Sequence, residues 1–320
     1  MNLRIGSRGS QLALWQAGYI AGLLRGQGHS VEIEIIKTTG DRLQEVEFAQ
    51  VGSKGMFTKE IEEALAEGRV DLAVHSLKDL PTELAESFAL AATPARVDPR
   101  DAFVSAKYGS LADLPQDARV GTSSQRRRAQ LRALRPDIEA VEFRGNVDTR
   151  LRKLAEGQVD AILLAAAGLD RLGKTEWVRE RLEPGAFCPA AGQGSLGIET
   201  RKDDEATIAA VAFLDDPATR FAVTAERAAL AALGGGCQVP IGVHCRVEPP
   251  GQESEAASRT GPGVEIFAVV AGEKTGAAVR IVHREPRADA DPAALGRLAA
   301  RMLIEAGAGP LLEAAGGGLR

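Results

Sequence analysis

The sequence contains little cysteine and none of the long apolar segments of membrane or exported proteins. It has 320 residues and three cysteines, with no Cys-x-x-Cys pair. No apolar run approaches the ~20 residues that a membrane span needs, and the N-terminal MNLRIGSRGS lacks the apolar core of a signal peptide. We therefore expect a cytoplasmic protein without membrane association, in which Cys188, Cys237 and Cys245 are reduced.

Motifs for metals, nucleotides and nucleic acids are also missing. The four histidines are scattered, and only His244 adjoins a cysteine, so we expect no metal site. Neither GxGxxG nor GxxxxGK[ST] occurs, which argues against a nucleotide-phosphate enzyme. The net charge of −5 argues against a general nucleic-acid binder.

The sequence does contain a strongly basic segment. Residues 119–153 hold ten Lys or Arg against four acids, a local charge of +6 on a chain that is negative overall. A solvated helix face would explain part of this excess, and a site for a small polyanion is the other reading. The overall composition, 44% hydrophobic and 26% charged, is that of a globular protein with room for two or three domains.

A weak internal repeat defines the expected architecture. KGMFTKEIEEALAEGRVDLAVHSLKDL begins at Lys54, and RGNVDTRLRKLAEGQVDAILLAAAGLDRL begins at Arg144. Both run from a basic residue and a glycine through an amphipathic helix and LAEG into an apolar strand. An earlier pair, LRIGSRGSQLALWQ and ARVGTSSQRRRAQL, leads from a strand through a Gly/Ser/Arg turn into a helix, with Ser10 and Ser123 or Ser124 as N-caps.

Two copies of one order predict two similar α/β lobes with largely parallel sheets. The basic turns follow the strands, at the edge of a parallel sheet where ligands bind, and helix N-termini there favour anions. We therefore expect four basic loops to face one another across a cleft between the lobes.

Turn-rich segments indicate where the chain changes lobe. TPARVDPRD (93–101) and PAAGQGSLG (189–197) predict two crossings. We expect residues 1–94 with 195–213 to form lobe one, 95–194 lobe two, and 214–320 a smaller α+β C-terminal domain. In that domain we expect a helix over 218–233, strands near 241–248, 264–272 and 278–284, and a helix over 291–307.

Several residues suggest chemistry. Lys78 and Asp79 follow an apolar strand, and a carboxylate among cations can stabilise a developing cation or shuttle a proton. Arg126 and Arg127 begin a helix, where cations oppose the helix dipole unless an anion lies between. Arg8 is expected nearer a ligand than Arg4, which lies within its strand.

Two glycine-bearing segments allow more than one reading. The long segment 38–55 is either a lid or lacks order. In LGGGCQVP (233–240), Cys237 is either a small buried apolar residue or a reachable thiol on a pliable arm that carries it towards the cleft.

Together these segments resemble the porphobilinogen deaminase family, also called hydroxymethylbilane synthases. The resemblance extends from about Leu3 to Val243 and is looser beyond. It rests on the shared order of RIGSRGSQLALWQ, VGSKGMFTKE, DLAVHSLKDLP, DPRDAFVS, VGTSSQRR, RGNVDTRL, DAILLAAAGLDRLG, PAAGQGSLGIE, VTAERA and GGGCQVPIG.

The resemblance implies a transferase that condenses four porphobilinogen molecules head to tail into 1-hydroxymethylbilane, a haem precursor, with release of ammonia. It also implies a dipyrromethane cofactor linked as a thioether to Cys237, and a monomer. The fold it implies is α/β, with two similar periplasmic-binding-protein-like lobes around a cleft and a smaller α+β C-terminal domain. Each porphobilinogen carries an acetate and a propionate, so the growing chain is a polyanion that suits the basic segment.

The resemblance also implies roles for individual residues. Asp79 would be catalytic, stabilising the cation left when ammonia departs and handling protons. The cofactor would contact Lys78, Ser124, Arg126, Arg127 and Arg150. The substrate or growing chain would contact Arg8, Ser10, Lys54, Arg144, Arg171 and Gln193. Gln50, Gln125 and Gly234 depart from the family pattern and bear on how the chain is handled.

A non-catalytic bilobal anion-binding protein is the alternative. It would share the lobes and the basic cleft, but would need neither Cys237 nor the pair Lys78 and Asp79.

Overall fold

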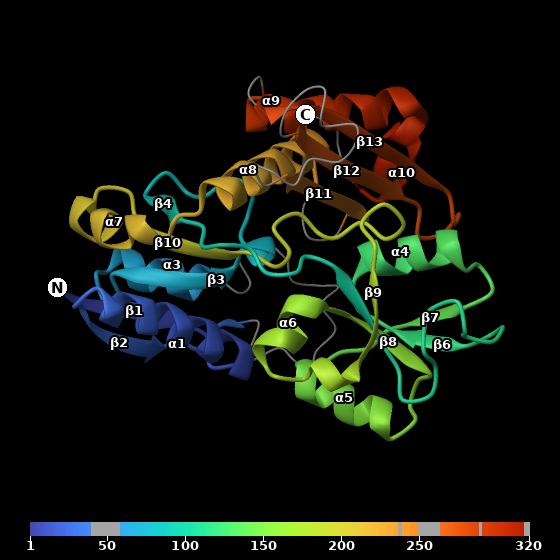
Figure 1. Cartoon of the computed structure of the whole chain (residues 1–320), viewed down its shortest axis with the longest axis horizontal. Coiled ribbons are helices and arrows are strands. Elements are labelled where there is room, and N and C mark those ends of the chain that lie inside the picture. The colour runs from blue at the N-terminus through green and yellow to red at the C-terminus, as the bar shows by residue number, and fades with distance from the viewer. Residues whose placement is uncertain (40–57, 236–238, 249–262, 288–289, 317–320) are drawn as a thin grey trace.

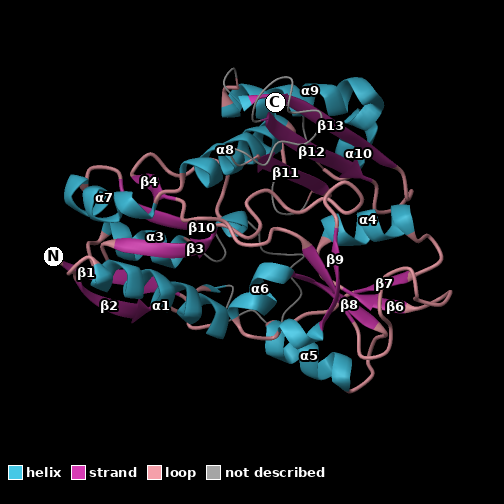
Figure 2. Ribbon diagram, viewed as in Figure 1, coloured by secondary structure: helices cyan, strands magenta, loops and turns pink. Residues whose placement is uncertain are grey.

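The computed structural model describes residues 1–39, 58–235, 239–248, 263–287 and 290–316. Within these ranges the strands form three sheets, each with its own helices (Figures 1 and 2). Two sheets have five strands each, and the third has three. Among these residues no helix is both long and apolar enough to cross a membrane.

The first sheet is the framework of lobe one and has the strand order β2-β1-β3-β10-β4. Its strands are β1 (Asn2–Ser7), β2 (Ser30–Ile35), β3 (Leu72–Ser76), β4 (Phe88–Ala92) and β10 (Leu196–Arg201). The helices around it are α1 (Gln11–Gly26), α3 (Lys59–Ala66) and α7 (Glu205–Val211). One face of the sheet and α1 enclose a core that includes Ile5, Ile20 and Val74.

The second sheet is the framework of lobe two and has the order β7-β6-β8-β5-β9. Its strands are β5 (Asp101–Val104), β6 (Arg119–Gly121), β7 (Glu139–Val141), β8 (Ala161–Ala165) and β9 (Val178–Leu182). Its helices are α4 (Gln125–Leu134), α5 (Val147–Ala155) and α6 (Ala166–Arg171). The first three strands of the repeat have the same order in both lobes: β1 lies between β2 and β3, and β6 lies between β7 and β8. The prediction of two similar α/β lobes is therefore confirmed.

The prediction of largely parallel sheets was wrong, because the sheet of each lobe is mixed. β1 pairs in parallel with β2 and β3, whereas β10 is antiparallel to both β3 and β4. In lobe two, β5 is likewise antiparallel to both β8 and β9. The reason is the route of the chain. β5 follows the first crossing (residues 93–100) and β10 the second (residues 183–195), so each is the strand with which the chain enters a lobe from the other.

The third sheet belongs to the C-terminal domain and has the antiparallel order β11-β12-β13. Its strands are β11 (Ile241–Val247), β12 (Gly263–Ala271) and β13 (Ala278–Pro286). Helices α8 (Pro217–Ala232), α9 (Pro292–Leu303) and α10 (Gly309–Ala314) pack on it around one apolar core. The strands and helices expected here are confirmed, except that α9 ends four residues early, where a π-helical turn (304–308) follows.

The domain is in contact with both lobes (Figure 1). Arg220 of α8 donates hydrogen bonds to β4 of lobe one, and α4 of lobe two packs on β12 and β13. The exact boundaries expected between the three parts remain a prediction, since the sheets define only which strands belong together.

Candidate active site

The turns that follow the strands of the repeat open helices as expected. Ser10 accepts a hydrogen bond from the Ala13 amide and caps α1, and Ser124 accepts one from the Arg127 amide and caps α4. Both expected N-caps are therefore confirmed, Ser124 being the one of the two candidates that acts. Arg4 pairs at 2.8 Å with Asp71, the residue directly before β3, which agrees with a structural role.

A pocket of about 70 Å³ lies at the edge of lobe one where β1 and β3 end. It brings together Arg8, Ser10 and Asp79, three of the residues predicted to act on substrate. The neighbouring polar side chains that line it are Gln16, Thr58, His75 and Ser76. Asp79 is exposed at the end of a 3-10 turn (Leu77–Asp79), so its carboxylate is open to a ligand entering from solvent.

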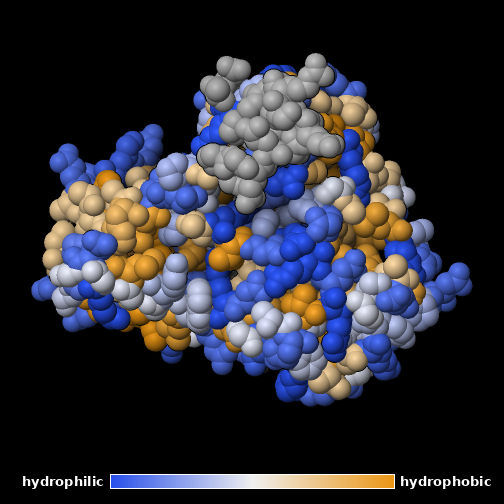
Figure 3. Space-filling view, viewed as in Figure 1, coloured by the Kyte–Doolittle hydropathy of each residue, from blue (hydrophilic) through white to orange (hydrophobic). Residues whose placement is uncertain are grey.

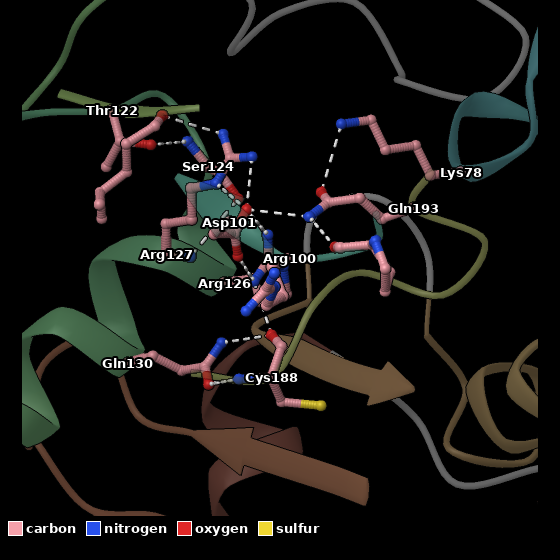
Figure 4. A network of polar contacts seen from close by, with 12 residues as sticks. Lys78, Arg100, Asp101, Thr122, Ser124, Arg126, Arg127, Gln130, Cys188 and Gln193 are labelled. Carbon is pink, nitrogen blue, oxygen red and sulfur yellow. Dashed lines mark hydrogen bonds and ion pairs between the residues drawn. The ribbon is translucent and has the colours of Figure 1, made fainter. Parts of the chain in front are cut away.

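A chain of polar contacts connects this pocket with lobe two (Figure 4). The Nζ atom of Lys78 lies 3.4 Å from Oε1 of Gln193, on the second crossing. Nε2 of Gln193 donates to Oδ1 of Asp101, the first residue of β5, at 3.0 Å, and to the carbonyl of Pro99 at 2.7 Å. The turn of Lys78 and Asp79 in lobe one and strand β5 of lobe two are thus joined by one buried glutamine.

Both arginines at the start of α4 bind the same buried carboxylate. Nη1 of Arg126 lies 2.7 Å from Oδ2 of Asp101, and Nη2 of Arg127 lies 2.7 Å from Oδ1 (Figure 4). Burial would raise the pKa of Asp101, but the charges of Arg126 and Arg127 outweigh burial and hold that pKa well below its usual range. The anion expected between these cations and the helix start is therefore a residue of the chain itself, and it neutralises only one of the two charges.

Two further cations in this region, Lys78 and Arg150, form no ion pair with the described residues. Burial lowers the pKa of Lys78 to about 8. The charges of Arg127 and Arg126 lower this pKa as well, whereas those of Asp79 and Asp101 oppose the shift. Burial also lowers the pKa of Arg150 to about 10, and the nearby charge of Arg127 lowers it further. Nε of Arg150 donates to the carbonyl of Gly145 at 2.8 Å. In Figure 3 hydrophilic residues gather in the middle of the face, between the two lobes.

The remaining predicted residues lie apart from this cluster or outside the described ranges. Arg171 is buried, and its Nη2 donates to the carbonyl of Gly194 on the second crossing at 2.8 Å. Arg144 pairs with Glu142 at 2.7 Å. Lys54, the segment 41–53 and Cys237 lie outside the residues that the structure describes. Cys188 and Cys245 are buried, and burial raises the pKa of both thiols.

Sequence reasoning missed two buried acids. Asp101 is the first residue of an otherwise apolar strand, DAFV, and is buried. A single acid at such a position, upstream of a segment rich in arginine, is a signal that could have identified it. Glu226 on α8 binds Arg96 of the first crossing at 2.6 Å and the Gly192 amide of the second at 2.6 Å. Its partners are distant in sequence, so no local pattern indicates them.

Comparison with known proteins decides the family. Residues 3–209 match the family described as "Porphobilinogen deaminase, dipyromethane cofactor binding domain", and residues 220–305 match the porphobilinogen deaminase C-terminal domain. The chain belongs to the porphobilinogen deaminase family. Porphobilinogen deaminase of Trichlorobacter lovleyi is 49% identical over 313 residues, covering 97% of this chain and 96% of that protein. That of Roseiflexus castenholzii is also 49% identical over 313 residues, covering 97% and 98%.

As a member of the porphobilinogen deaminase family, the chain is a transferase that condenses porphobilinogen into hydroxymethylbilane in tetrapyrrole biosynthesis. Its larger matched domain binds a dipyrromethane cofactor. Among solved structures, a periplasmic substrate-binding protein of an ABC transporter from Coxiella burnetii has a TM-score of 0.41 at 16% identity, covering 68% of this chain and 94% of that one. A nutrient-binding protein from Burkholderia cenocepacia has a TM-score of 0.40 at 14% identity, covering 65% and 89%.

Proposed function

We propose that Asp79 is the catalytic group of this transferase, and that Cys237 carries the dipyrromethane cofactor as a thioether. In this proposal four porphobilinogen molecules are joined head to tail, each with loss of ammonia, by a chain that acts as a monomer in the cytoplasm. The observation that carries it is the position of Asp79, a carboxylate open to solvent in a pocket with Arg8 and Ser10 and next to Lys78.

The residues present fit a cofactor with several carboxylates. Arg126 and Arg127 share one carboxylate, and burial lowers the pKa values of Lys78 and Arg150, as expected of cations whose desolvation is not offset by an ion pair. Buried charge of one sign is costly unless it is paired. A polyanion between the lobes would supply the missing negative charge, with Lys78, Ser124, Arg126, Arg127 and Arg150 as its contacts. When bound, the cofactor supplies the terminal pyrrole carbon to which substrate is joined.

The chain's own residues would then bind and activate porphobilinogen. Arginine forks suit the carboxylates of the substrate and growing chain, which assigns Arg8, Arg144 and Arg171, with Ser10, Lys54 and Gln193, to binding. The carboxylate of Asp79 would accept a hydrogen bond from the protonated aminomethyl nitrogen, which keeps its three protons and leaves as ammonia when the C–N bond breaks. It would then stabilise the positive charge that remains on the substrate carbon and pyrrole nitrogen.

Replacing Asp79 tests the catalytic assignment. Asp79→Ala should fold normally and lose about 100-fold or more in kcat, the scale of a positioned acid-base group. Hydroxymethylbilane formation from porphobilinogen is the measurement. Asp203→Ala removes another exposed carboxylate of lobe one, beyond the pocket, and should keep its activity. Near-normal turnover by Asp79→Ala would remove Asp79 from the mechanism.

Intact mass tests the attachment of the cofactor. Because Cys188 and Cys245 are buried thiols with raised pKa values, they are poor nucleophiles, which supports Cys237 as the reactive one. Each S–C or C–C bond formed releases one ammonia, so the parent protein should carry two porphobilinogen units less two ammonias. Cys237→Ala should lack this mass and Cys188→Ala should retain it. A parent of unmodified mass after incubation with porphobilinogen would overturn the attachment.

A further inference from the structure

Arg227, on α8 of the C-terminal domain, donates hydrogen bonds to the segment that directly follows Asp79. Its Nη2 donates to the carbonyl of Pro81 at 2.6 Å and to that of Thr82 at 3.0 Å, and its Nη1 lies 3.5 Å from the carbonyl of Leu80. Three consecutive carbonyls of lobe one therefore converge on one guanidinium from another domain. Because the guanidinium is planar and holds its N–H donors in a fixed fork, it restrains all three peptide groups together.

The same face of α8 also packs against the residues on either side of Asp79. Val223, one helical turn before Arg227, shares a buried apolar cluster with Leu77 and Leu80. Residues four apart lie on one face of a helix, so the apolar contact and the hydrogen bonds act on the same side of the turn. A single face of α8 thus holds the chain immediately before and immediately after Lys78 and Asp79.

The position of the guanidinium costs energy that its contacts must offset. Burial lowers the pKa of Arg227, with the charge of Glu199 on β10 opposing that shift. A half-buried cation whose hydrogen bonds go to three neutral carbonyls is a poor source of stability, because desolvation of the charge offsets much of what the bonds supply. The arrangement does specify geometry well, because loss of the guanidinium would leave three carbonyls free to turn.

We propose that Arg227 is a positioning residue that fixes the catalytic turn, so that the aim of the Asp79 carboxylate depends on how α8 is seated against lobe one. The proposal rests on the catalytic role of Asp79 given above. α8 ends at Ala232, five residues before Cys237 in the sequence. The helix nearest in sequence to the proposed cofactor thiol is therefore the one that holds the acid of the reaction.

Another arginine of the same helix offers a matched control. Arg220 also donates to backbone carbonyls of lobe one, those of Leu90 and Ala91, each at 3.0 Å, and pairs with Asp215. It docks α8 on β4 and does not reach the catalytic turn. Arg227→Met and Arg220→Met therefore remove comparable contacts between the C-terminal domain and lobe one, and differ in which segment is released.

The experiment compares the two variants as holoenzymes whose full cofactor mass has been checked. Arg227→Met should lose about 10-fold in kcat with KM within about two-fold, because misplacing a catalytic group by ~1 Å can cost about 100-fold. Arg220→Met should keep kcat within about two-fold. Amide exchange in segment 77–84 should speed up about 10-fold in Arg227→Met only, as local opening becomes easier. Arg227→Lys, which can still donate to two carbonyls, should recover part of the lost kcat.

Two results would overturn the proposal. One is normal kcat and normal exchange in Arg227→Met, and the other is an equal loss of kcat in both methionine variants, which would show that docking of α8 is all that matters. Failure of the wider function is separable, since it would show as near-normal turnover in Asp79→Ala. In that case a loss of kcat in Arg227→Met could not act through Asp79, and the positioning proposal would fall with it.

Discussion

Lys78 is a cation that the folded chain holds at a cost. Its ammonium lies 3.4 Å from a neutral amide oxygen, and burial lowers its pKa from 10.5 to about 8. Such a depressed pKa means that the native state binds the proton less tightly than the unfolded state does. The cost to folding is therefore full below pH 8 and disappears as the pH rises past 10.5, above which Lys78 is neutral in both states.

Lys78→Met should stabilise the protein that lacks its cofactor. In a Cys237→Ser background, the free energy of unfolding at pH 7 should rise by up to about 3 kcal/mol, and the gain should fall towards zero near pH 10.5. In the protein with its cofactor the sign should reverse, because the ammonium would then be paired with a carboxylate. Denaturant unfolding at several pH values measures both.

The control for that experiment is Lys202→Met, at an exposed lysine of lobe one. Its effect on unfolding should stay within about 0.5 kcal/mol, as for most surface substitutions. A Lys78→Met variant that is destabilised equally at pH 7 and at pH 10 would contradict the account of Lys78 as a cation whose desolvation outweighs the charges of its neighbours.

At the scale of helices and strands, the elements of the internal repeat could be predicted from the sequence. The direction of β5 and β10, the strands that follow the two crossings, could not. Hydrophobic pattern and glycine stops predict β1, α1 and β3 and their copies, because these signals are local. β5 and β10 also read as apolar strands, but pattern carries no information on direction, so their antiparallel entry was missed. The same limit hid Asp101, since its partners Arg126 and Arg127 begin a helix 25 residues later and reach it only through the sheet.

The second crossing is built on two glycines with left-handed backbone. Gly192 has φ +74° and Gly194 has φ +88°. A Cβ on Gly192 would lie 3.2 Å from the amide nitrogen of Lys78, and one on Gly194 would lie 2.6 Å from the carbonyl oxygen of Val97 on the first crossing. The two crossings thus approach each other more closely at Gly194 than a Cβ allows, and Gly192 lies tightly against the turn of Lys78 and Asp79.

Gly194→Ala should be strongly destabilising for two separable reasons. The left-handed backbone costs about 1–2 kcal/mol for a residue with a Cβ, and overpacking against a carbonyl that cannot move aside adds about 1–3 kcal/mol. Gly173→Ala isolates the first cost, because Gly173 has φ +65° and open space around a Cβ. Thermal unfolding of both variants measures the difference. Equal losses would show that the crossings separate freely, against the close approach described.

On the scale of the whole molecule, Glu226 joins all three parts. Its carboxylate accepts hydrogen bonds from Arg96 on the first crossing, from the Gly192 amide on the second, and from the Cys245 amide on β11 at 2.7 Å. Burial would raise the pKa of Glu226, but Arg96 and His244 outweigh burial and lower it to about 2. The carboxylate is therefore charged at neutral pH and fully committed to its partners.

Glu226→Gln should uncouple the C-terminal domain from the lobes. The variant leaves Arg96 buried without its charge partner and sets an amide NH₂ against one of the backbone N–H donors, which together cost about 3–5 kcal/mol. Because the native pKa lies below the unfolded value of 4.5, the charge contributes stability above pH 4.5 that is lost as the pH falls through 2. The difference in unfolding free energy between parent and variant should therefore narrow below pH 4.5.

The control is Glu265→Gln, which breaks a surface ion pair with exposed Arg246 on the same domain and should cost less than about 1 kcal/mol. Calorimetry should resolve one transition in the parent and two in Glu226→Gln, since the domain has a core of its own. A single cooperative transition in that variant would mean that the apolar contacts of α8, rather than this carboxylate, hold the three parts together.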